Sequence, residues 1–122
     1  MTKAAALFEW FNGFLPAYPA SNVPKDVIFP YLTYELVLGA WGDEDIGITV
    51  NLWYYTESEA EPNAMADKMS KAIGRGGTYV ECDGGAILIK RGNPWCQNVV
   101  DERDTNIKRR YINISLEYLT ED

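Results

Sequence analysis

The chain contains no histidine, so its candidate reactive side chains are mainly its carboxylates and two cysteines. Ser–His and Cys–His nucleophiles are therefore excluded, and acid–base catalysis would need a carboxylate, tyrosine, lysine or cysteine. Two acidic pairs are close in sequence: Glu57 with Glu59, and Asp101 with Asp104. Each falls in an expected turn or helix cap, where solvated acids are common. The sequence predicts no catalytic residues, and a hydrolase that uses these carboxylates is the enzymatic alternative.

The sequence also predicts no metal or cofactor. Cys82 and Cys96 lie outside any CxxC pair, which argues against zinc. Asp43, Glu44 and Asp45 lack the spaced oxygen ligands of a calcium loop, so a solvated turn is expected. The glycines around Arg75 follow a predicted helix and precede a strand, which is the reverse of a phosphate-binding loop.

Neither a secretory signal nor a stretch of eighteen apolar residues is apparent. We therefore expect no membrane segment and two reduced thiols, although the spacing of the cysteines leaves a disulfide open.

Charge is distributed unevenly along the chain, whose net charge is −7. Residues 1–67 contain two basic and ten acidic side chains, whereas residues 68–122 contain nine basic and eight acidic ones. The overall negative charge argues against a DNA-reading surface, which needs a basic field. The acidic first part and the near-neutral, Arg-bearing second part could face each other between neighbouring copies, and two differently solvated surfaces are the simpler alternative.

The stretch 46–55, IGITVNLWYY, predicts a central strand because apolar side chains alternate along it. Its Ile/Val/Leu face should carry helices. The opposite face ends in Trp53 and Tyr55, and we expect this aromatic end to be covered either by the proline-rich segment 16–30 or by a neighbouring subunit.

The other expected elements are two helices and strands at 31–38, 78–82, 86–91 and 107–119. The first helix is expected at 4–15, and the second follows the capping-box pattern 58–61 and ends at Gly74, with Pro62 either in its first turn or at its start. Asp83-Gly84 predicts a hairpin turn, whereas 16–30 and 92–106 are expected to be irregular connections. In the last strand the alternation places Arg110 on the same face as Ile112 and Ile114.

The length suits one domain, residues 1–122. The predicted class is α+β: a mainly antiparallel sheet of about four to five strands with two helices packed on one face.

Four stretches carry a family resemblance: FPYLTYEL at 29–36, LWYYTES at 52–58, IGRGGTYVECDGGAILIKRGNPW at 73–95 and RRYINISLEYLTED at 109–122. Together they resemble the tail completion proteins, also called tail terminator or head-tail joining proteins, of bacteriophages and prophages of Gram-positive hosts.

This resemblance implies a structural virion protein that forms a ring, commonly a hexamer, at the head-proximal end of the tail tube. Its partners would be further copies of itself, the tail tube protein and the head-tail connector. It would reside in the host cytoplasm during assembly and in the virion tail afterwards. DNA would pass through the ring without specific binding, which suits an acidic lumen. A small acidic protein-binding or regulatory module encoded in a prophage is the alternative.

Ring contacts of this kind join two different surfaces of successive copies. The expected interface residues are exposed aromatic and charged side chains in loops, together with the aromatic end of the central strand. They are Trp41, Asp43, Glu44, Asp45, Trp53, Arg75, Trp95, Asp101, Arg103 and Asp104.

Overall fold

A computed structural model describes residues 1–122, and its sheet is built around β3 (Ile46–Tyr55) as the sequence predicts. Ile48, Val50, Leu52 and Tyr54 are buried on one face of this strand, and the residues between them are more exposed. β3 pairs antiparallel with β2 (Tyr31–Tyr34) on one side and with β6 (Ile107–Thr120) on the other. The last strand of the chain therefore lies beside the central one.

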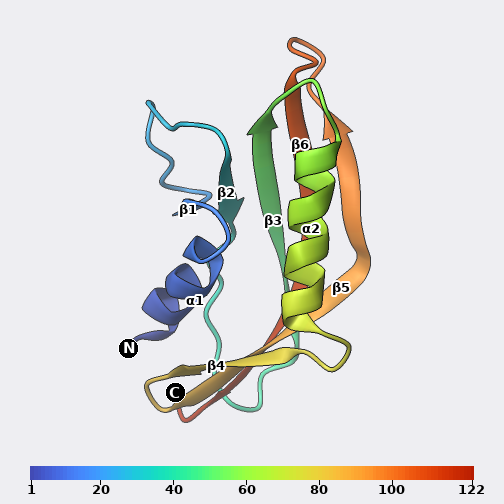
Figure 1. Ribbon diagram of the computed structural model, residues 1–122. Coiled ribbons are helices and arrows are strands. Elements are labelled where there is room, and N and C mark those ends of the chain that lie inside the picture. Colours follow the sequence, from blue (N-terminus) through green and yellow to red (C-terminus); the bar gives the residue numbers. More distant parts are fainter.

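The sheet has six strands rather than four to five, in the order β1-β2-β3-β6-β5-β4 (Figure 1). The additional strand is β1 (Ala17–Pro19), which runs parallel to β2 inside the proline-rich segment expected to be irregular. The strand was not expected because Pro16 and Pro19 are unusual in strands. Proline is tolerated here because β1 is an edge strand, where a missing amide donor breaks no pairing on the outer side. The sheet is therefore mixed, with antiparallel pairing everywhere except at this edge.

β5 (Gly85–Val100) is much longer than the expected strand 86–91, so residues 92–100 are not a loop. Its pairing with β6 shifts between Arg91, opposite Ile114, and Cys96, opposite Ile112. Four residues of β5 thus face one of β6, which makes a bulge. Asn113 donates to the Pro94 carbonyl across it at 2.8 Å. A glycine and a proline in the bulge obscure the alternation that would have revealed a continuous strand.

β2 is shorter than the expected strand 31–38, and residues 35–45 form the connection to β3. This segment leaves β3 and approaches the end of β6 instead. The Tyr118 hydroxyl donates to the Val37 carbonyl, and the Trp41 amide donates to the Thr120 carbonyl at 2.8 Å. These bonds hold residues 37–41 at the end of β6 instead of in a longer β2.

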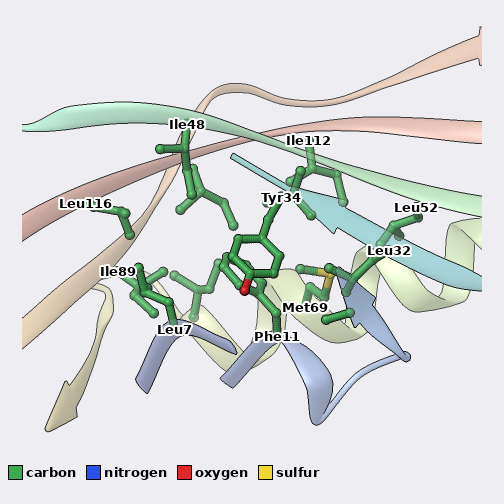
Figure 2. Close-up of a cluster of buried hydrophobic side chains, with 14 of the residues drawn as sticks. Leu7, Phe11, Leu32, Tyr34, Ile48, Leu52, Met69, Ile89, Ile112 and Leu116 are labelled. Atoms are coloured by element: carbon green, nitrogen blue, oxygen red, sulfur yellow. The ribbon is translucent and has the colours of Figure 1, made fainter. Parts of the chain in front are cut away.

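The helices are α1 (Lys3–Asn12), which ends before the expected residue 15, and α2 (Ala60–Ile73). Both lie on the same face of the sheet, as predicted, and share one core with it (Figure 2). Phe11 of α1 stacks on Tyr34 of β2 with ring centroids 4.6 Å apart, while Met69 of α2 is fully buried. This cluster explains why both helices carry an apolar stripe.

The sheet curls so that its two edges come near α1. Figure 1 shows β4 (Thr78–Cys82) crossing beneath the molecule, and α1 contacts both β4 and β1. The β4–β5 hairpin turns at Asp83-Gly84 as predicted, with Gly84 at φ +82°. Since β1 and β4 do not pair with each other, α1 fills part of the gap between the sheet edges.

Candidate subunit interface

The expected interface residues lie at separate places in the fold. The loop 41–45 precedes Ile46, which pairs with Leu116, whereas loop 101–106 lies at the other end of the sheet, where Tyr55 pairs with Ile107 (Figure 1). Trp53, Asp101 and Arg103 line one open pocket at that second end, of about 500 Å³. Arg75 follows α2, and Trp95 packs in the β5 bulge against the core. The ten residues thus do not form one continuous surface.

The loop 41–45 presents an exposed aromatic ring beside acids that already have partners. The Trp41 side chain is 66% exposed. Asp43 accepts a hydrogen bond from the Ala40 amide at 2.8 Å, and Asp45 pairs with Lys90 at 2.6 Å. The hydrogen bond to Asp45 raises the pKa of Lys90. Glu44 is exposed and makes no ion pair.

Large apolar side chains are exposed just before this loop. Leu36, Val37 and Leu38 follow β2 without regular secondary structure, and Leu38 is 53% exposed. With Trp41 they define what we call the apolar arm, residues 36–41. Consecutive exposed apolar residues of this size are unusual on a monomer surface and mark contact sites for other proteins. The sequence assigned Leu36, Val37 and Leu38 to a strand, and the early end of β2 is what exposes them.

Trp53 is half-buried on the helix-free face of the sheet, where its own chain supplies partners. Its indole N–H donates to Thr33 Oγ1 at 3.0 Å. Tyr31 stacks against it with centroids 5.9 Å apart, and the Arg109 guanidinium lies 5.2 Å from its ring centroid. This cation–π geometry stabilises both side chains.

The proline-rich segment, one of the two covers that the sequence left open, contacts the aromatic end of β3. Phe29 contacts Tyr31 and Tyr55, with centroid distances of 5.3 and 5.8 Å, and Tyr18 contacts Tyr31 at 6.2 Å. Tyr31 is buried as a result, whereas Tyr55 stays exposed. The proline-rich segment thus covers this end only in part, because Tyr55 keeps 56% of its surface exposed.

The acids of loop 101–106 are engaged in turn formation. Asp101 accepts from the Arg103 amide at 2.8 Å and from the Asp104 amide at 3.2 Å. Asp104 in turn accepts from the Asn106 amide at 3.0 Å. Such side-chain to backbone bonds are typical of Asp in turns. These two carboxylates stabilise the loop, and Arg103 remains exposed without an ion pair.

A groove that lies between α1 and β4 is lined by none of the expected interface residues. Trp10 and Phe14 are only partly buried and, with Val80, line a cavity of about 770 Å³. Glu9, Glu81 and Asp83 also line it. A sequence signal did exist: Phe8, Trp10, Phe11 and Phe14 cover more of the helix circumference than one buried stripe needs.

The N-terminus closes one end of this α1–β4 groove. The Met1 ammonium pairs with Asp83 at 2.6 Å, and this hydrogen bond raises the pKa of the ammonium group. Met1 also accepts a backbone hydrogen bond from the Asp83 amide at 2.7 Å. By contrast, neither Glu9 nor Glu81 has a cationic partner in the chain.

The structure contains no cluster of three His, Cys, Asp or Glu side chains that could hold a metal ion. Cys82 and Cys96 are free thiols, and burial raises the pKa of each. No helix is both long enough and apolar enough to cross a bilayer. Comparison with protein-family models, with curated proteins and with solved structures found no match.

Proposed function

We propose that this chain is a tail completion protein that assembles as a ring on the head-proximal end of a phage tail tube and joins it to the head connector. The observation that carries the proposal is the apolar arm, residues 36–41, whose large apolar side chains are exposed to solvent. Hydrogen bonds from the Tyr118 hydroxyl to the Val37 carbonyl and from the Trp41 amide to the Thr120 carbonyl fix the arm to the end of β6, so it is presented in a defined position. A prepositioned apolar surface favours contact with another protein.

The distribution of surface features supports a ring rather than a two-fold dimer. The apolar arm lies at one end of the sheet, and loop 101–106 lies at the other (Figure 1). Contacts between unlike surfaces of successive copies close into rings when the rotation between copies permits it. The net charge of −7 suits a ring through which DNA passes, because a negative lumen repels phosphates. Within this proposal the partners are further copies, the tail tube protein and the connector.

Light scattering coupled to size-exclusion chromatography, at several concentrations, tests the proposal together with negative-stain microscopy. We expect a discrete closed oligomer, and rings at the ends of tubes formed by the tail tube protein of the same prophage. Replacing Leu38 and Trp41 with Ser should weaken assembly. The matched control is Ile28→Ser, because Ile28 is 81% exposed but lies outside the arm. Chains that stay monomeric at every concentration, and do not bind tail tubes, would refute the proposal.

The alternative, a small acidic regulatory module that acts outside the particle, makes a different prediction. Mass spectrometry of purified phage particles induced from the host would then lack this chain, whereas a ring component should be present in a fixed ratio to the tail tube protein. The neighbouring genes give an independent check, since portal, capsid and tail-tube genes should flank the coding sequence.

A further inference from the structure

The α1–β4 groove runs along a free strand edge. Four consecutive residues, 80–83, line the groove. Successive side chains of a strand point to opposite faces of the sheet, so a groove on one face would be lined only by every second residue. The groove therefore follows the backbone of β4 rather than one face of the sheet. β4 is the last strand of the sheet, so its outer side has no strand partner. An exposed strand edge of this kind favours contact with another chain.

The residues that line the groove favour binding of a positively charged side chain. Its floor is apolar, with Trp10, Phe14 and Val80, while Glu9 and Glu81 contribute two carboxylates without a cationic partner. The third acid, Asp83, is already neutralised by the Met1 ammonium. Aromatic rings beside carboxylates suit an arginine, whose planar guanidinium stacks and donates at the same time.

The chain contains one loop with matching chemistry. Residues 74–77, between α2 and β4, form the only connection between elements that carries a basic residue and no acidic one. Arg75 is exposed and makes no ion pair or side-chain hydrogen bond. Cβ atoms added at Gly74 or Gly76 would meet nothing within 4 Å, whereas one at Gly77 would overlap the Ile89 carbonyl oxygen. The loop is therefore open on both sides of Arg75 and anchored against β5 at Gly77. Lys68, also exposed and unpaired, adds positive charge on α2 nearby.

The groove and the loop cannot meet within one molecule. Figure 1 shows α1 on one side and the loop after α2 on the opposite side, separated by β4. We propose that the 74–77 loop of one copy places Arg75 against Glu9 and Glu81 in the α1–β4 groove of the next copy. This contact joins two different surfaces, which is the arrangement a ring requires. The inference rests on the proposed function and specifies its subunit contact.

Charge reversal tests the contact. Arg75→Glu alone, or Glu81→Lys alone, sets like charges against each other and should weaken association by about two orders of magnitude in sedimentation velocity. The variant carrying both changes restores opposite charges between positions 75 and 81 while Glu9 stays unchanged, and it should recover much of the ring formation. Lys25→Glu and Glu57→Lys are matched controls, because they make the same charge changes at exposed positions outside the groove and loop. Circular dichroism verifies that each variant is folded.

The outcomes separate this contact from the ring itself. If the unaltered chain forms rings and both single reversals form them equally well, the contact is wrong and the proposed function stands. If both single reversals abolish rings but the paired reversal does not restore them, the direct pairing of Arg75 with Glu81 is wrong. If the unaltered chain forms no assembly, alone or on tail tubes, both proposals fall.

Discussion

Arg110 donates two hydrogen bonds to Asn63 Oδ1, from Nε at 3.1 Å and from Nη2 at 3.0 Å, and thereby links β6 to the first turns of α2. Its side chain is almost fully buried and also pairs with Glu59, which is partly exposed. A buried guanidinium depends on such acceptors, because an unpartnered charge away from water is strongly unfavourable.

Removing the acceptors should therefore harm the fold more than removing the arginine. We expect the double change of Glu59 and Asn63 to Ala to lower the free energy of unfolding by about 3–5 kcal/mol. Arg110→Met replaces the guanidinium by an apolar chain of similar length and leaves two acceptors that water can reach, so its loss should be smaller. Urea denaturation measures both, and the reverse order would contradict this account of the site.

Tyr118 should make stability fall at high pH. Burial raises its pKa from 10.0 to about 12. The folded chain thus holds the phenol proton more tightly than the unfolded chain, and the associated stability is fully present below pH 10 and is lost as the pH rises through about 12. Over this window the loss amounts to roughly 2–3 kcal/mol. Urea midpoints measured from pH 9 to 12 should fall less steeply for Tyr118→Phe, and equal slopes would exclude this group as the cause.

The two glycines of the β4–β5 turn should differ sharply in their tolerance of alanine. Gly84 and Gly85 both have positive φ, at +82° and +153°. A Cβ at Gly84 would come no closer than 3.3 Å to another atom, whereas one at Gly85 would overlap the Leu119 carbonyl oxygen. We expect Gly84→Ala to cost about 1–2 kcal/mol through backbone strain alone. Gly85→Ala should lower the free energy of unfolding clearly more. Equal thermal midpoints for the two variants would show that β5 and β6 can move apart at this position with little loss of stability.

Cys82 and Cys96 should never join within one chain. Cys82 pairs with Gly85, which lies opposite Thr120, while Cys96 lies opposite Ile112. Eight residues of β6 separate these positions, about 26 Å along an extended strand. A disulfide needs Cα atoms within about 7 Å of each other. Mild oxidation followed by mass spectrometry should find no intramolecular bond, and a loss of two mass units in the intact monomer would contradict the register.

Burial raises the pKa of both thiols, so they should also react slowly. Alkylation by iodoacetamide at pH 8 should be slower in the folded chain than in urea, because less thiolate is present and access is reduced. Equal rates in the two conditions would show that these side chains are more open than the structure indicates.

Where the period-two pattern is unbroken, the sequence predicts the fold well. The bounds of β3 are those expected, the last strand differs by one residue, and Arg110 does lie on the buried face. Prediction fails where the chain departs from regular geometry. Prolines conceal β1, the bulge around Gly92 and Pro94 conceals the second half of β5, and tertiary bonds from β6 end β2 early.

The interface residues were harder to predict because solvent exposure depends on long-range contacts. Trp53 is of a residue type that is common in subunit contacts, yet Tyr31 stacks on its ring and the Arg109 guanidinium lies over it. Asp101 and Asp104 look like free acids but bind backbone amides. The α1–β4 groove combines segments more than 60 residues apart in the sequence, and no local pattern indicates which helix and strand will meet.

The position of α1 between the sheet edges has a consequence for synthesis of the chain. Met1 is bound to Asp83, and α1 packs on β4, so α1 cannot acquire these partners until residues 78–83 have been made. The β3–β6 pairing likewise joins Ile46 to Leu116. Chains dominated by such distant contacts fold slowly. The nascent chain should therefore stay largely unfolded until β6 has emerged from the ribosome, and chaperones can bind its apolar segments up to that point.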